Sequence, residues 1–228
     1  NQDVMHDAYS FIVHRIKALD SVSSPIELDD DSLGSLMTPV IPPLSEELQT
    51  RDNLYTCINQ TAAVQLTQTC WLQNISQACY SQSDIAVQLM SLYLRLAGIG
   101  CEGASVQQLY RALILTSGHQ IPVLHSYDYS QQPEVLSEVY DFAVVQLALA
   151  RFPRVLLPEI LGFTLAYCQT PALLEVCFPG QQQALPFFEL HRQLAEGQLQ
   201  PLRSCILNYL ELFPGQKQQL WQRIQKGF

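Results

Sequence analysis

The stretch RFPRVLLPEILGFTLAYC, residues 151–168, holds one acidic side chain, Glu159, within a run of largely apolar residues. Burying an ionised carboxylate without a partner costs several kcal/mol, which is a large part of a domain's stability. The carboxylate must therefore reach water or meet a cation, a metal or a hydrogen-bond network. Pro153 and Pro158 also predict that the helix of this run is kinked or restarted.

The rest of the chain from Ser45 onward carries helical signals almost throughout. Ser45 begins a capping box, SEEL, and the segment that follows is predicted to run to about Tyr80. No stretch alternates as a half-buried strand would, so we predict an all-α bundle of about seven helices. Caps, apolar spacing and Gly or Pro breaks place further helices at about 83–98, 105–118, 133–149, 187–212 (interrupted at 197 and 201) and, as a short amphipathic tail, 217–226.

Two segments precede this predicted bundle. Residues 1–20 place apolar side chains at helical spacing, which predicts an amphipathic helix. Residues 21–44 contain four prolines, an acidic triplet and many serines, which is typical of a linker or an extended strap. We therefore divide the chain into an N-terminal helix (1–20), a strap (21–44) and a helical domain (45–228).

Composition excludes several classes of partner. The chain has 12 basic and 21 acidic residues, a net charge of −9, and no basic stripe, which argues against binding nucleic acid or an anionic membrane. Its apolar stretches are broken before the roughly 20 residues that a membrane span needs. Seven scattered cysteines form no CxxC pair and predict buried free thiols in a reducing cytoplasm. They are Cys57, Cys70, Cys79, Cys101, Cys168, Cys177 and Cys205.

Few residues are candidates for chemistry on pattern alone. Glu159 follows Pro158 at a predicted helix start, where exposed amides and the helix dipole favour an anion. His191 lies among apolar residues in PFFELHRQL, where a histidine is usually structural. The sequence has no clustered metal-binding histidines, Gly-rich phosphate loop or nucleophile elbow.

FPRVLLPEILGFTLAY together with the later FFELH resembles the haem-oxygenase-like iron-containing redox enzymes, also called haem-oxygenase-like diiron oxidases. The resemblance covers roughly residues 45–212 and implies a haem-oxygenase-like bundle around non-haem iron. In that family a P-E-L-L-G-type helix donates a glutamate to the iron, which corresponds to Glu159. A later F-F-D-L-H helix donates a histidine, which corresponds to His191, then an acid four residues on and a second histidine seven residues on. An earlier helix supplies a further glutamate and histidine.

The chain departs from this ligand pattern at the remaining positions. The later acid and histidine are replaced by Ala195 and Gln198. On the earlier helix the two ligand positions fall on Cys79 (or Tyr80) and Leu89. One carboxylate and one imidazole do not balance the charge of two iron ions. We therefore interpret the site as degenerate and expect the carboxylate of Glu159 to be held by helix-start amides, by a protonated His191, or by Arg151 or Arg154.

Three functional interpretations follow. The first is a non-catalytic haem-oxygenase-like domain, with no cofactor, that binds a protein partner, another domain of a larger chain, or an apolar ligand. The start at Asn1 fits a module of a larger protein. The family resemblance also implies a homodimer. The second is an oxygenase or oxidase that holds non-haem iron through Glu159, His191 and either Asp84 or Glu189, and that oxidises a small amine, amino acid or fatty-acid-like substrate. The third is an unrelated helical bundle.

Overall fold

The regular structure of the described residues is helical. The computed structural model describes residues 2–19, 33, 51–78, 83–99, 105–116, 121–123, 126–133, 135–169 and 186–228, and within these ranges it contains helices and no strand. This confirms the predicted all-α class. The predicted strap at 21–44 and the predicted Ser45 cap lie outside the described residues, except for Leu33.

The N-terminal amphipathic helix is present as α1 (Gln2–Leu19), with Ile12 buried. The predicted continuous helix to Tyr80 is wrong, because α3 (Arg51–Leu66) ends well before that residue. A buried turn, Thr67–Thr69, follows α3, and two short 3-10 helices, η2 (Cys70–Leu72) and η3 (Ile75–Gln77), come after it. Thr69 has a φ of 66°, which an α-helix does not accommodate. The Thr67 hydroxyl also donates to the carbonyl of Ala63, the kind of local bond that competes with helix continuation.

The ends of the next two helices follow from their capping residues, as predicted. α4 (Ser83–Leu96) is terminated at Gly98, whose φ of 69° allows Ile99 to donate back to the carbonyl of Leu94. α5 (Val106–Thr116) begins after a reciprocal cap, in which the Ser105 hydroxyl accepts from the Gln108 amide and the Gln108 side chain accepts from the Ser105 amide. A one-turn helix, α6 (Tyr127–Ser130), lies between the segments predicted as helices at 105–118 and 133–149.

The stretch 151–168 divides between two helices, as its prolines predict. α7 (Ser137–Arg151) begins four residues later than the predicted start at Pro133 and ends at the first residue of the stretch. α8 (Leu157–Gln169) then begins one residue before Pro158. Pro158 therefore lies in the first turn of the helix, where a proline loses no helical hydrogen bond. The break predicted at Gly197 also occurs, between α10 (Pro186–Glu196) and α11 (Leu199–Glu211). The interruption predicted at Pro201 is wrong, because this proline lies in the first turn of α11, where it loses no helical hydrogen bond.

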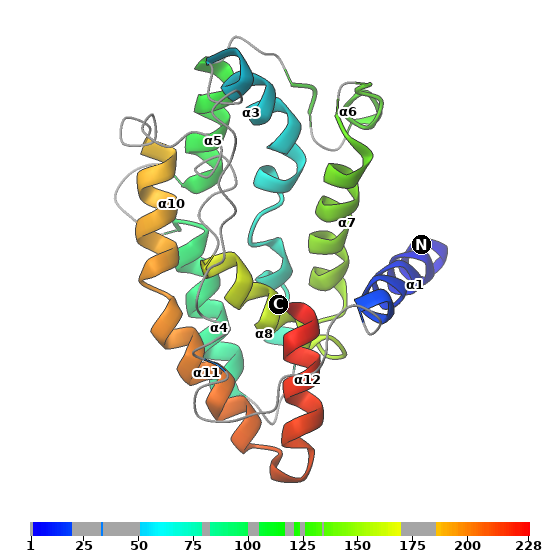
Figure 1. Cartoon of the computed structure of the whole chain (residues 1–228), viewed down its shortest axis with the longest axis vertical. Coiled ribbons are helices and arrows are strands. Elements are labelled where there is room, and N and C mark those ends of the chain that lie inside the picture. Colours follow the sequence, from blue (N-terminus) through cyan, green and yellow to red (C-terminus); the bar gives the residue numbers. More distant parts are fainter. Residues whose placement is uncertain are drawn as a thin grey trace.

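α8 occupies the middle of the bundle, with α10, α11 and α12 among the helices packed against it (Figure 1). α3 lies beside both α5 and α7, and α1 lies at the edge of the molecule against α7. A large core cluster gathers buried residues of α4, α8, α11 and α12, including Leu89, Leu161, Ile206 and Trp221.

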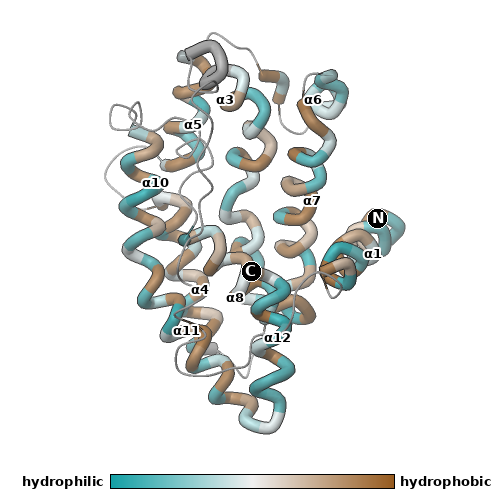
Figure 2. Tube along the Cα trace, in the orientation of Figure 1, coloured by the Kyte–Doolittle hydropathy of each residue, from teal (hydrophilic) through white to brown (hydrophobic). Residues whose placement is uncertain are grey.

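The C-terminal helix α12 (Lys217–Gly227) is an integral part of this core, although its sequence predicts only an amphipathic tail. Most of its residues are hydrophilic (Figure 2), but Leu220, Trp221 and Ile224 form a narrow apolar stripe that is buried. A turn of 3-10 helix, η5 (Pro214–Gln216), reverses the chain after α11 so that α12 returns along α8.

Glycines allow α8 and α12 to approach at backbone contact. A Cβ added to Gly162 would lie 1.8 Å from the carbonyl oxygen of Ile224, and one added to Gly227 would lie 2.0 Å from that of Glu159. Neither position accommodates a side chain without separating the helices. This close approach brings the first turn of α8 against the last turns of α12.

Candidate functional site

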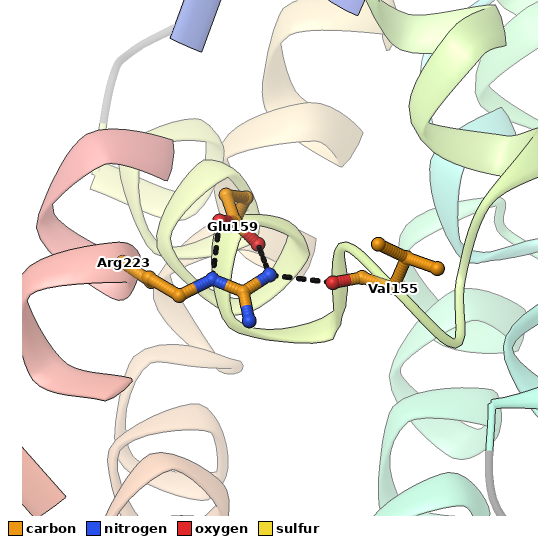
Figure 3. A network of polar contacts seen from close by, with 3 residues as sticks. All are labelled: Val155, Glu159 and Arg223. Atoms are coloured by element: carbon orange, nitrogen blue, oxygen red, sulfur yellow. Dashed lines mark hydrogen bonds and ion pairs between the residues drawn. The ribbon is translucent and has the colours of Figure 1, made fainter. Parts of the chain in front are cut away.

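The carboxylate of Glu159 is buried and paired with an arginine on α12. Glu159 lies in the first turn of α8 and is 4% exposed. Nε of Arg223 donates to Oε1 at 2.7 Å, and Nη2 donates to Oε2 at 2.7 Å (Figure 3). This bidentate geometry is the strongest that an arginine and a carboxylate form. The negative charge of Glu159 is therefore balanced within the protein.

Arg223 also holds the backbone that precedes α8. Its Nη2 donates to the carbonyl of Val155, in the turn between α7 and α8 (Figure 3). The side chain of Arg223 is 33% exposed, so its guanidinium remains in partial contact with water. One side chain of α12 thus fixes both the first turn of α8 and the turn that leads into it.

The side chains predicted as partners of Glu159 were wrong. Arg154 donates through Nε to the carbonyl of Gln77, and Arg151 is exposed at the end of α7. Both oxygens of Glu159 accept from Arg223 instead. Arg223 lies 64 residues away from Glu159 in sequence, on a helix whose packing against α8 no local sequence pattern predicts.

His191 is a buried, neutral histidine on α10. It is 4% exposed, and its ring packs against Tyr167 at 5.3 Å and against Phe187 at 6.0 Å between ring centroids. Burial lowers its pKa from 6.5 to about 4, since desolvation penalises the charged form. A protonated His191 is therefore excluded as the partner of Glu159 at neutral pH.

Glu159 lies at the start of α8, whereas His191 packs near the end of that helix. His191 packs against the ring of Tyr167 on α8, eight positions after Glu159, which corresponds to ~12 Å along a helix axis. Glu159 faces α12, whereas Tyr167 meets α10. The described contacts therefore do not join the two residues into one metal site.

The other predicted site residues are also dispersed. Asp84 is exposed in the first turn of α4, and Glu189 forms surface contacts with Arg192 and Gln193. The three described departures from the family ligands, Leu89, Ala195 and Gln198, are all buried. Cys79 lies outside the described residues.

These residues do not fit the iron centre that the resemblance implies. Within the described ranges, no three His, Cys, Asp or Glu side chains gather closely enough to hold a metal ion. The one buried carboxylate of the family pattern already accepts two hydrogen bonds from a guanidinium. A cation at Glu159 would have to displace Arg223 and leave the guanidinium charge without its partner.

The described cysteines are free thiols, as predicted, but Cys57 and Cys70 are only half-buried, whereas all were predicted to be buried. These are Cys57, Cys70, Cys168 and Cys205. Burial raises the pKa of Cys70, Cys168 and Cys205 to about 12, so these thiols stay protonated at neutral pH and are poor nucleophiles.

Stability should fall in acid because of His191. Unfolded histidine has a pKa near 6.5, whereas folded His191 has one of about 4, so the unfolded state takes up the proton first as the pH falls. The neutral His191 contributes ~3 kcal/mol to the free energy of unfolding above pH 6.5, and this contribution is lost as the pH falls from about 6.5 to 4.

Urea unfolding at pH 7 and pH 4.5 measures this effect. Between pH 7 and pH 4.5, the free energy of unfolding of the wild type should fall by about 2.5 kcal/mol more than that of His191→Gln. His14→Gln, which changes an exposed histidine of α1, should keep the wild-type pH dependence. An unchanged pH dependence in His191→Gln would show that the histidine is not held neutral.

No helix in the described part of the chain combines the length and the hydropathy that crossing a bilayer requires. No family model, curated protein or solved structure was found to match this chain.

Proposed function

We propose that the chain is a non-catalytic helical domain of the haem-oxygenase-like type, which acts by binding a protein partner, another domain of a larger chain, or an apolar ligand. The observation that carries this proposal is the bidentate ion pair between Glu159 and Arg223. The position that corresponds to the family's metal-binding glutamate serves here to hold two helices together.

The haem-oxygenase-like part of the proposal rests on the placement of two motifs. P-E-I-L-G lies on α8 and F-F-E-L-H on α10, and these helices pack against each other in an all-α arrangement. The non-catalytic part rests on the side chains at the other ligand positions. Leu89 and Ala195 offer no donor atom to a metal, and a Gln198 amide is a weak replacement for imidazole.

A binding role is supported by apolar side chains that two adjoining helices leave exposed. α1 exposes Val4 and Met5, and α7 exposes Phe142 and Leu147. The two helices are linked by the ion pair of Arg15 with Asp141. Exposed apolar side chains mark a binding surface where they form one contiguous patch.

Metal analysis of the protein purified from iron-supplemented cells tests the proposal. We expect far less than one iron per chain and the same trace amount in the wild type, Glu159→Ala and His191→Ala. Circular dichroism establishes that each variant is folded. Stoichiometric iron in the wild type that is lost in both variants, but retained in the surface control Glu138→Ala, would contradict the proposal and favour an oxygen-activating enzyme.

A further inference from the structure

One side of α7 carries exposed apolar side chains. Val144 is 42% exposed and Leu147 is 48% exposed. Tyr140 and Arg151 extend this side toward the two ends of the helix, since positions three and four residues apart share one side. Arg151 is exposed and Tyr140 is half-buried. We call these positions, Tyr140, Val144, Leu147 and Arg151, the α7 seam.

The α7 seam has the spacing of a coiled-coil helix. Its intervals of four, three and four residues are those of successive a and d positions in a heptad. Val144 and Arg151 then occupy a positions, and Tyr140 and Leu147 occupy d positions. α7 runs along the outside of the bundle beside α3 (Figure 1). An outer helix that packs only within its own domain carries polar residues on its far side, so the apolar seam favours a second helix packed against it.

We propose that two copies of the chain associate through antiparallel packing of their α7 seams. When two heptad helices pack antiparallel, each a position of one helix faces a d position of the other. Val144 of each copy then faces Leu147 of the other copy, which gives two apolar layers at the centre of the interface. Arg151 of each copy faces Tyr140 of the other copy, and a guanidinium over a tyrosine ring is attractive. The seam is therefore complementary to itself, as an interface with two-fold symmetry requires.

Charges beside the seam favour the antiparallel direction. Asp141 adjoins Tyr140 in sequence, and its side chain is 48% exposed even though Arg15 contacts it. An antiparallel pair brings Arg151 of one copy beside Asp141 of the other, so opposite charges meet at both ends of the interface. A parallel pair would instead place the two arginines together and the two aspartates together. The antiparallel pair also sets the dipoles of the two helices in opposite directions.

Exposed apolar side chains at the two ends of α7 extend this complementarity. Leu136 directly precedes the helix and Val155 follows its end by four residues, and both side chains are exposed. Antiparallel packing sets the N-terminal end of one α7 beside the C-terminal end of the other, which brings Leu136 of one copy toward Val155 of the other. The pairing thus covers apolar side chains that a single copy leaves exposed.

The association should be weak. One pair of helices of this length buries less than the ~1,200 Å² of a standard interface, so we expect a Kd on the order of 100 µM. The inference names a second copy as the protein partner of the α7 surface, and in that respect it rests on the proposed function.

Sedimentation equilibrium at protein concentrations from about 10 µM to about 1 mM measures this association. The wild type should pass from monomer to dimer within that range. Leu147→Glu should weaken the dimer at least ~tenfold, because it places a carboxylate in each apolar layer. The control Leu207→Glu changes a leucine of similar exposure, 42%, on α11 and should dimerise like the wild type. Circular dichroism establishes that each variant is folded.

A mixture of two variants tests the antiparallel register. Val144→Lys and Leu147→Glu should each be mainly monomeric at about 100 µM. An equimolar mixture of the two should form dimers, because the introduced lysine of one copy faces the introduced glutamate of the other. The unchanged Leu147 of the first variant then faces the unchanged Val144 of the second. In a parallel pair the two introduced charges would not face each other.

A wild type that remains monomeric at about 1 mM would overturn the proposal and leave the seam to a partner of another sequence. A folded Leu147→Glu protein that dimerises like the wild type would also overturn it, as would a mixture that stays monomeric. Iron content is measured separately from sedimentation, so failure of the dimer and failure of the proposed function are distinguishable.

Discussion

Gly162→Ala should destabilise the protein by about 3 kcal/mol, even though alanine is the better helix former. The Cβ would lie 1.8 Å from the carbonyl oxygen of Ile224, which is backbone and cannot rotate away. Helix propensity favours alanine by only about 1 kcal/mol. Separating α8 from α12 would loosen the packing of Trp221 and Ile224, both fully buried, so the clash outweighs the propensity.

Two other glycines provide matched controls in the same urea titration. Gly215→Ala should change the free energy of unfolding by less than about 1 kcal/mol, because nothing lies within 4 Å of its added Cβ. Gly227→Ala should fall between the two, since its Cβ meets the Glu159 carbonyl at 2.0 Å but lies in the last turn of α12, which can shift. A Gly162→Ala protein as stable as the wild type would contradict the close approach of the two helices.

Glu159→Ala should cost about 2–3 kcal/mol at pH 7. Breaking a buried ion pair by removing one partner costs about 3–5 kcal/mol, and the partial exposure of Arg223 lowers that figure because water solvates the freed guanidinium. The shorter side chain also removes the anchor that aligns Arg223 with the carbonyl of Val155. α12 should therefore detach more easily than in the wild type.

Urea titration followed by tryptophan fluorescence measures this loss, because Trp221 is buried on α12 two residues before Arg223. The surface pair of Glu211 with Lys217 supplies the control, and Glu211→Ala should cost less than about 1 kcal/mol. Equal effects of Glu159→Ala and Glu211→Ala would show that the buried pair contributes no more than an exposed one.

The helix ends could be predicted from sequence because capping is a local property. Gly98 and the Ser105–Gln108 cap each lie within a few residues of the helix end that they cap. The break after Leu66 was missed because tertiary contacts favour it. The Thr67 hydroxyl reaches Gln146 on α7, a contact between residues 79 positions apart in sequence.

The candidate site was predictable only in part for the same reason. The apolar run around Glu159 correctly indicated that its carboxylate needs a partner, but the only arginines considered were those close to it in sequence. Arg223 adjoins the apolar stripe of α12, between Leu220 and Ile224, and this position was the one available sign that it faces the core. Similarly, the apolar neighbours of His191 predicted a structural role, whereas its contact with Tyr167 depends on how α8 meets α10.

The central claim is that Glu159 acts as the partner of Arg223, and a double-mutant cycle tests it most directly. The free energy of unfolding would be measured for wild type, Glu159→Ala, Arg223→Ala and the double variant. We expect the double variant to lose less stability than the sum of the two single losses, with a coupling energy of about 2 kcal/mol between the two side chains. Strictly additive losses would contradict the claim and leave the charge of Glu159 to be balanced by something else.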